Sequence, residues 1–475
     1  MSERIEEIMM LNRLSKIRIP GWIVELSILA IIIILSATLR FYKLGEWSFW
    51  GDEAFTISTK EDGFNYSILR RSMATDLIRF SISYLGVSEW NARLTPALIG
   101  IITIPLIYFP TRRLFGIGTA LLTVAFLAIS PWHLYWSQNA RFYTLLLLFY
   151  SLGLLTFQIA LEEDRSWLFI GSLFLFGLAA RERLIALIFL PVICLYLISI
   201  WLLPFDKPKG FRCKNLLLFL APIFIVGILF IAPYAANLGA WFQGFGRVNT
   251  TPFWILAGTT YYVNLPILII ASFGCLYLLI RKNRTGLLLG INAFLPLATI
   301  MILSTFHYAA NRYLFITLIS WFILAAFAIV ELYKNSEGAT RVLALGLLTL
   351  ALLAPLSEDV LYFQYQNGNR DNWKAALNYV EENRQNGDLV ISANTDVSNF
   401  YLNEQTISMN NWDPGEISEG YRAWFIEDMN VAELQPELLS WLKDNTVEKA
   451  NFDVHAQARN FKMRVYFYDT LSQPH

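Results

Sequence analysis

Residues 21–54, GWIVELSILAIIIILSATLRFYKLGEWSFWGDEA, run from a long apolar segment into two adjacent carboxylates, Asp52 and Glu53. An apolar run of about 20 residues is long enough for one helix to cross a bilayer. The acidic pair therefore lies where the chain leaves the membrane. Acidic residues at a membrane surface are costly unless they are paired, hydrated or used. The pair is the first candidate for a functional site.

The composition is that of a membrane protein. Of 475 residues, 56% are hydrophobic and 16% are charged, and the mean hydropathy is +0.46. Soluble proteins carry roughly 25% charged residues. Cys194, Cys213 and Cys275 are the three cysteines, and their spacing is not that of metal ligands, so we interpret them as packing residues. The basic residues fall between apolar segments, which indicates membrane topology and not a nucleic-acid surface.

Apolar segments predict about eleven transmembrane helices. They cover residues 21–40, 93–111, 114–131, 142–161, 167–180, 184–203, 215–235, 252–280, 285–305, 313–332 and 341–356. Lys and Arg gather in alternate connections, which the positive-inside rule places in the cytoplasm. The first outer loop, 41–92, then lies outside the cytoplasm together with the C-terminal end. Apolar residues at helical spacing near 64–69 and 77–80 predict one or two surface helices in that loop.

A change in charge marks a domain boundary near Glu358. From Glu358 onward there are 19 acidic and 9 basic residues, a net of −10, which leaves +10 on residues 1–357. We expect a membrane domain over 1–357 and a small soluble α/β domain over 358–475. Its pattern predicts helices at 373–380 and 431–442 and strands at 389–392, 423–426 and 464–468. It has no Gly-rich phosphate loop, so we interpret it as a lid or an acceptor-binding module.

Polar and charged residues follow several spans at their outer ends, so the predicted topology brings them to one face. They are Asp52, Glu53, His133, Gln138, Asn139, Arg141, Arg181, Glu182, Arg183, His307, Asn311, Arg312 and Tyr313. Arginine binds phosphate oxygens with two parallel hydrogen bonds. A carboxylate near a weak nucleophile can act as a general base. A divalent cation held by carboxylates is the other way to neutralise a phosphate leaving group.

Several motifs, taken in order, resemble those of GT-C membrane glycosyltransferases of the protein O-mannosyltransferase and aminoarabinose transferase type. They lie at residues 39–54, 91–100, 137–143, 307–314 and 370–373. The resemblance implies a polyprenyl-phosphate-linked sugar donor and transfer to a hydroxyl of a lipid, glycan or protein. It also implies a multi-pass protein of the plasma (inner) membrane, in contact with membrane lipids, with an extracytoplasmic C-terminal domain and no nucleic-acid partner.

The resemblance also implies roles for single residues. Asp52 is then the catalytic base, Glu53 orients it or helps to hold a metal, and Arg141 and Arg312 bind the donor phosphate. The remaining candidates for substrate binding are Trp50, Tyr143, Arg181, Glu182, Arg183, His307 and Tyr313. No residue is assigned as a metal ligand, because Gln138-Asn139 stand where the family often has an acidic residue. A divalent cation (Mg, Mn or Zn) stays open as a cofactor.

Other functions and simpler roles fit parts of the pattern. A transporter or flippase of a lipid-linked or anionic solute would carry charges at mid-span and internal repeats, and the nearly charge-free spans favour the enzyme. A receptor would depend on the acidic tail and not on Asp52. The acidic pair could be a solvated loop edge, Trp50 an interface anchor, and residues 181–183 a self-neutralising triplet.

Overall fold

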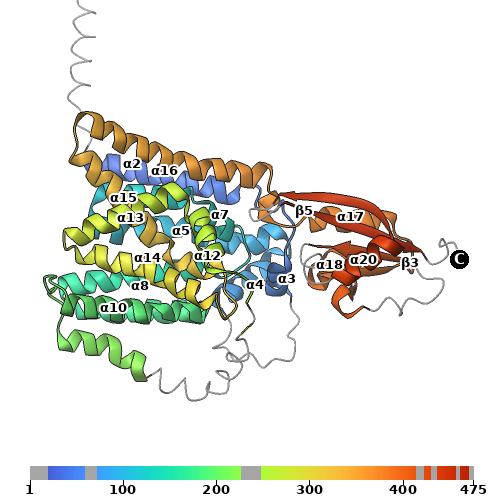
Figure 1. The fold of residues 1–475 in the computed structure, drawn as a ribbon, viewed down its shortest axis with the longest axis horizontal. Coiled ribbons are helices and arrows are strands. Elements are labelled where there is room, and N and C mark those ends of the chain that lie inside the picture. The colour runs from blue at the N-terminus through green and yellow to red at the C-terminus, as the bar shows by residue number, and fades with distance from the viewer. Residues whose placement is uncertain are drawn as a thin grey trace, which may run out of the picture.

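The computed structural model describes residues 20–58, 72–225, 246, 248–412, 422–428, 436–455 and 460–469. A bundle of apolar helices forms one end of the molecule, and a sheet covered by helices forms the other (Figure 1). The bundle contains α2 (Gly21–Phe41), α5 (Glu89–Phe115), α6 (Ile117–Ala128), α8 (Tyr143–Glu163), α9 (Ser166–Glu182), η2 (Leu184–Ile188), α10 (Phe189–Leu202), Cys213–Ile225, α12 (Pro252–Val263), α13 (Leu265–Ile280), α14 (Arg284–Leu303), η3 (Asn311–Thr317), α15 (Leu318–Lys334) and α16 (Gly338–Gln364). Three short helices accompany it, namely α3 (Gly51–Ile57), α4 (Met73–Leu85) and α7 (Pro131–Ser137).

The protein is an integral membrane protein with fewer straight spans than the sequence pattern predicts. Within the described chain, seven helical segments are long and apolar enough to cross a membrane, or nine if each bent pair counts as one span. The expected span at 252–280 is two helices, α12 and α13, which meet at 96° where Asn264 has a φ of +80°. The helix at the expected span 167–180, α9, has only 17 residues. The span expected at 215–235 is described only as the helix Cys213–Ile225, because its later part lies outside the described residues.

The surface helix expected at 77–80 is present as α4, whereas the one expected near 64–69 lies outside the described residues. Ser72 begins α4 by accepting a hydrogen bond from the Thr75 backbone N–H at 3.1 Å.

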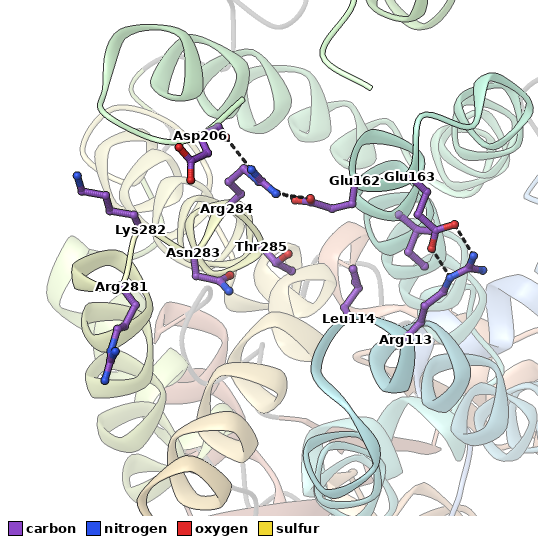
Figure 2. Close-up of a pocket in the computed structure, with 11 residues that line it drawn as sticks. Arg113, Leu114, Glu162, Glu163, Asp206, Arg281, Lys282, Asn283, Arg284 and Thr285 are labelled. Atoms are coloured by element: carbon purple, nitrogen blue, oxygen red, sulfur yellow. Dashed lines mark hydrogen bonds and ion pairs between the residues drawn. The ribbon is translucent and has the colours of Figure 1, made fainter. Parts of the chain in front are cut away.

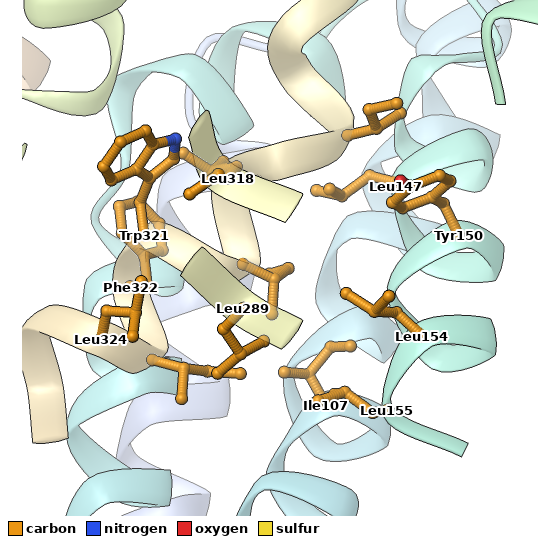
Figure 3. Packing of buried hydrophobic residues seen from close by; sticks show 14 of the residues in the cluster. Ile107, Leu147, Tyr150, Leu154, Leu155, Leu289, Leu318, Trp321, Phe322 and Leu324 are labelled. Carbon is orange, nitrogen blue, oxygen red and sulfur yellow. The ribbon is translucent and has the colours of Figure 1, made fainter. Parts of the chain in front are cut away.

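The centre of the bundle is built around α8 and α15. Their most apolar windows are 83% and 78% buried, compared with 22% for α2 and 17% for α16. Leu147 and Leu154 of α8 belong to the same continuous apolar core as Leu289 of α14 and Trp321 of α15 (Figure 3). Lipid is as apolar as leucine, so close van der Waals packing holds these helices together.

The C-terminal sheet has the strand order β2-β1-β3-β5-β4. Strand β1 is parallel to β2 and β3, and β5 is antiparallel to β3 and β4. The elements are α17 (Trp373–Asn383), β1 (Leu389–Ser392), α18 (Thr395–Leu402), β2 (Ile407–Ser408), β3 (Arg422–Glu427), α20 (Pro436–Asn445), β4 (Val447–His455) and β5 (Asn460–Asp469). Alternate residues of β1 and β3 pack against α17 and α18 on one face and against α20 on the other.

Three strands and the first helix of this unit were predicted from sequence, and all four are confirmed. The helix expected at 431–442 is described only from Pro436 onward, as α20. Helix α16 continues to Gln364, past residue 358, and the two-domain division there stays a prediction.

The sheet unit is attached to the end of the bundle that carries α3. The Ser48 hydroxyl donates to the Asp371 carbonyl at 2.6 Å, and the Phe49 backbone N–H donates to the Tyr401 hydroxyl at 2.8 Å. Lys374 forms an ion pair with Glu89 at 2.8 Å. These contacts tie the loop containing Asp52 to the sheet unit.

Candidate functional site

Asp52 lies in the first turn of α3, and two arginines from distant parts of the chain reach it. Its Oδ2 atom lies 3.3 Å from Nη2 of Arg141 and 3.9 Å from Nη1 of Arg312. Arg141 precedes α8, and Arg312 belongs to η3. The Asp52 side chain is 38% exposed, so a ligand can reach it. The convergence that the sequence analysis expected is therefore present for these three residues.

The two arginines keep hydrogen-bonding capacity. Arg141 Nη1 donates to the Asp52 carbonyl at 2.9 Å and to the Thr56 hydroxyl at 3.0 Å. The Nε atoms of Arg141 and Arg312 are buried and have no hydrogen-bond partner among the described residues. Burial lowers the pKa of Arg141 and Asp52 opposes the shift. Buried donors without a partner are costly, and an added anion would satisfy them.

Arg183 and Tyr143 complete the surroundings of Asp52. The guanidinium of Arg183 lies 4.7 Å from the ring centre of Phe142, and that of Arg141 lies 5.2 Å from the same ring. Tyr143 lies within electrostatic range of Asp52 and of all three arginines. Its ring packs on Trp136 at a centroid distance of 3.8 Å. Arg141 and Arg183 therefore pack on the same aromatic ring, next to Tyr143.

Glu53, unlike Asp52, is fully buried and saturated with hydrogen bonds. Arg93 donates to its two oxygens at 2.8 and 2.7 Å, and the Ala140 N–H donates at 2.7 Å. Nε of Arg370 lies 3.6 Å away. Burial alone would raise the pKa of Glu53, but Arg93, Arg370 and the Ala140 hydrogen bond hold it below its usual range.

The sequence analysis included Arg93 and Arg370 in motifs of the resemblance but assigned neither a role at this site. Arg93 also donates to the carbonyls of Leu44, Trp47 and Ser48 at 3.2, 2.9 and 2.9 Å, which fixes the path of the loop. Arg370 donates to the Gln138 carbonyl at 2.6 Å. For Arg93 the available signal was an arginine beside an apolar run, since such a charge needs a partner.

Two of the remaining candidates contact α4 and not Asp52. Arg181 forms an ion pair with Asp76 at 3.7 Å. The Glu182 carboxylate accepts the backbone N–H groups of Met73 and Ala74 at 2.9 and 3.2 Å, at the start of α4. These contacts position the surface helix against α9.

Trp50, His307 and Tyr313 lie at the margin of the site. Trp50 Nε1 donates to Asn139 Oδ1 at 2.6 Å. The Arg312 guanidinium lies 6.0 Å from the ring centre of Tyr313. Nδ1 of His307 lies 3.3 Å from the Tyr308 carbonyl. The substrate-binding roles of all these residues stay predictions.

Two cavities of similar size lie at opposite ends of the bundle. One, of about 410 Å³, opens beside Asp52 and is bordered by α3 and the sheet unit. The other, of about 400 Å³, lies among the opposite ends of α5 and α8 and the start of α14 (Figure 2). There Arg113 pairs with Glu163, and Arg284 pairs with Glu162, so those carboxylates are already neutralised. The cavity beside Asp52 is the better candidate for chemistry.

The residues around Asp52 do not suit a divalent cation. Metals of this kind need several oxygen, nitrogen or sulfur ligands in one place. In the described parts of the chain no group of three or more His, Cys, Asp and Glu residues could hold one. The charged groups that contact the Asp52 carboxylate are guanidinium groups.

Comparisons with known proteins identify similar sequences and folds. A family model described as dolichyl-phosphate-mannose-protein mannosyltransferase matches residues 73–233. No curated protein sequence matches the chain. The structure is similar to ArnT from Cupriavidus metallidurans in the apo state, with a TM-score of 0.58 and 14% identity over 96% of this chain and 99% of that one. The same protein bound to undecaprenyl phosphate matches with a TM-score of 0.57 and 15% identity, over the same shares of both chains.

An archaeal oligosaccharyltransferase is also similar. AglB from Archaeoglobus fulgidus, in complex with an inhibitory peptide and a dolichol-phosphate, matches with a TM-score of 0.57 and 13% identity over 96% of this chain and 75% of that one. A structure of that organism's oligosaccharyltransferase with zinc and sulfate matches with a TM-score of 0.54 and 13% identity, over 85% of this chain and 68% of that one. The predicted GT-C fold, a polytopic helical bundle with a small C-terminal sheet domain, is confirmed.

Proposed function

We propose that this protein, which has the fold of GT-C membrane glycosyltransferases, moves a sugar from a polyprenyl-phosphate donor to an acceptor hydroxyl. The observation that carries the proposal is the accessible Asp52 carboxylate, reached at 3.3 and 3.9 Å by arginines from two distant segments. Structures of the same fold contain undecaprenyl phosphate or a dolichol-phosphate. The acceptor hydroxyl belongs to a lipid, a glycan or a protein.

The reaction separates the tasks of these three side chains. Arg141 and Arg312 bind the donor phosphate, which takes over the charge contact that they now make with Asp52. The acceptor oxygen attacks the anomeric carbon while its proton passes to a carboxylate oxygen of Asp52. The bond between the anomeric carbon and the phosphate oxygen breaks, and polyprenyl phosphate leaves with the electron pair. The guanidinium groups stabilise the charge that develops on it. A single displacement of this kind inverts the anomeric carbon.

Glu53 acts in this proposal as a positioning residue. Its side chain is fully buried and bound on both oxygens by Arg93, so it supports the turn that carries Asp52. The arginines neutralise the leaving phosphate, and no step is assigned to a metal ion. Trp50, Tyr143 and Arg183 line the reacting groups, with His307 and Tyr313 beside them.

The reaction takes place outside the cytoplasm in this proposal, at the plasma (inner) membrane. Lysines and arginines gather in the connections at the bundle end that is remote from Asp52, for example Arg112, Arg113 and residues 281–284. The positive-inside rule assigns that end to the cytoplasm. The C-terminal sheet unit is then extracytoplasmic.

Purified full-length protein in liposomes, given a panel of radiolabelled polyprenyl-phosphate sugars and membrane lipid extract, is expected to consume one donor and release polyprenyl phosphate. A chelator is expected to leave the rate unchanged, because arginines supply the positive charge. Turnover should be counted as label transferred per protein molecule. Loss of turnover with the chelator, restored by Mg, Mn or Zn, would contradict the metal-free mechanism.

The same liposomes separate an enzyme from a transporter. A flippase would move the intact labelled lipid to the other leaflet and leave its sugar–phosphate bond unbroken. Lipid movement without bond cleavage for every donor in the panel would overturn the glycosyltransferase proposal.

Arg312→Gln is expected to raise the KM for the donor roughly ten- to hundredfold, the usual effect of losing a hydrogen bond to a charged group. The KM for the acceptor should not change. Arg312→Lys should recover only part of the loss, since lysine keeps the charge but not the planar pair of donors. Arg341→Gln is the matched control, because Arg341 lies over Tyr333, remote from the site. An unchanged donor KM in Arg312→Gln would remove Arg312 from the phosphate site.

A further inference from the structure

Arg312 is held less directly than Arg141. Arg141 donates to the Asp52 carbonyl at 2.9 Å and to the Thr56 hydroxyl at 3.0 Å. Among the described residues, the Arg312 guanidinium reaches the Asp52 carboxylate at 3.9 Å and donates to the Tyr308 hydroxyl at 3.4 Å. Contacts of this length are weak. The position of Arg312 therefore depends on the backbone that carries it.

Asn249 fixes the backbone three residues before Arg312. Its Oδ1 atom accepts the Ala309 N–H at 2.9 Å, and its Nδ2 atom donates to the Ala309 carbonyl at 3.0 Å. An amide side chain has both donors and acceptors, so it can pair with both backbone groups of one residue, as a residue of a neighbouring strand would. Two hydrogen bonds to the same residue fix its place and its orientation.

Asn311, the residue next to Arg312, binds helix α12. Its Nδ2 atom donates to the Ile255 carbonyl at 2.7 Å and to the Thr259 hydroxyl at 3.3 Å. Gly258 leaves the space that this amide occupies, because a Cβ atom added there would lie 2.5 Å from Nδ2 and 2.7 Å from Cγ of Asn311. Both distances are shorter than an ordinary van der Waals contact. The amide can therefore lie against α12 only while residue 258 is glycine.

Helix α12 is supported by the rest of the bundle. The Tyr261 hydroxyl donates to Oε2 of Glu358 in α16 at 2.5 Å. The Tyr262 ring stacks on Trp132 of α7 at a centroid distance of 5.0 Å. The Asn311 contact therefore fastens the segment that carries the arginine to a helix that is itself held in place.

We propose that Asn249 and Asn311 are positioning residues of the transfer reaction, which hold Arg312 where it can bind the donor phosphate. The proposal rests on the proposed function, because it explains how one of the two phosphate-binding arginines is placed. A hydrogen bond between a guanidinium and a phosphate is about 2.7–2.9 Å long, and a misplacement of about 1 Å takes its donors out of range. Loss of either asparagine should therefore weaken phosphate binding without removing a group that touches the phosphate.

The test is a binding measurement that separates positioning from general damage. Purified full-length protein in nanodiscs is dialysed against a radiolabelled, short-chain polyprenyl phosphate, the leaving group of the proposed reaction. Asn249→Ala and Asn311→Ala are each expected to raise its Kd about tenfold, the usual effect of weakening a hydrogen bond to a charged group. In the Arg312→Gln background, either substitution should raise the Kd no further, because the residue through which it acts is gone.

Gly258→Ala tests the contact with α12 while the asparagine remains. It is expected to raise the Kd about tenfold in wild type and not at all in Asn311→Ala, which lacks the atoms that the new Cβ meets. Alanine is a better helix former than glycine, so α12 itself is retained. Gly171→Ala in α9 is its control, since a Cβ added there has no described atom of another segment within 4 Å. Asn215→Ala is the control for the asparagines, because Asn215 is also buried and binds a backbone carbonyl at the other end of the bundle.

A tenfold rise that persists in the Arg312→Gln background would overturn the inference, because the asparagines would then act on the structure as a whole. An unchanged Kd in both asparagine variants, or in Arg312→Gln itself, would overturn it too. Sugar transfer, measured on the same preparation, reports on the proposed function separately. Binding that needs Arg312 but not the asparagines overturns the inference and leaves the transferase standing. Asparagine-dependent binding with no donor consumed overturns the transferase and leaves the placement of Arg312 standing.

Discussion

Asp52→Asn is expected to abolish sugar transfer while the protein stays folded and continues to bind its donor. Asparagine has the same shape as aspartate, but its amide cannot take a proton from the acceptor hydroxyl. Loss of a general base costs roughly 10²- to 10⁴-fold in rate. Folding should be little affected, because exposed ion pairs contribute about 0–1 kcal/mol. Donor binding should persist, because Arg141 and Arg312 are unchanged.

The control for this variant is Asp76→Asn. Asp76 is 40% exposed and pairs with Arg181 at 3.7 Å, which closely matches the exposure and the pairing of Asp52. Its amide variant should transfer sugar at the wild-type rate. The measurement is initial rate at saturating donor, with donor binding followed separately by equilibrium dialysis. A transfer rate near wild type in Asp52→Asn would exclude Asp52 as the base.

Glu53→Gln is expected to destabilise the protein by about 3–5 kcal/mol, the usual cost of leaving a buried charge without its partner. The side chains of Arg93 and Arg370 are each only 1% exposed, so water cannot replace the carboxylate. The lowered pKa of Glu53 gives the pH dependence. Its contribution to stability is complete above the ordinary carboxyl range and is lost as the pH falls through the lowered value.

Glu89→Gln is the matched control for Glu53→Gln. Glu89 also joins the bundle to the sheet unit, through Lys374, but at a position that is 13% exposed. Its loss should cost less than that of Glu53, because water reaches this carboxylate and its partner Lys374. Thermal unfolding in detergent, followed between pH 4 and pH 8, compares both variants with wild type. Equal melting temperatures for Glu53→Gln and wild type at pH 7 would contradict the assigned role.

The helices of the bundle could be predicted because long apolar runs have few alternatives in a membrane. The bend at Asn264 could not, since a positive φ leaves the apolar pattern of 252–280 unchanged. In the sheet unit, strands with buried apolar residues such as 389–392 were found, whereas β4 was missed because most of its residues are exposed.

The sequence identified which residues belong to the site better than it identified which of them pair with one another. The order of the motifs indicated that Asp52, Arg141 and Arg312 belong together, and the structure brings both guanidinium groups within 4 Å of the Asp52 carboxylate. Nothing local in the sequence pairs Glu53 with Arg93, 40 positions away, or with Arg370 in the C-terminal part. Glu182 was interpreted as a substrate ligand, and its contacts at the start of α4 arise only from tertiary packing.

Arg370 connects the C-terminal sheet unit to the proposed active site, although it is assigned no part in the reaction itself. Its guanidinium sits beside Glu53 and on the Gln138 carbonyl. A shortened protein that stops before this residue would lose one of the two counter-ions of Glu53, the residue next to the proposed base Asp52. We expect such a truncation to be inactive even though Asp52, Arg141 and Arg312 remain. Its inactivity would therefore not favour a receptor.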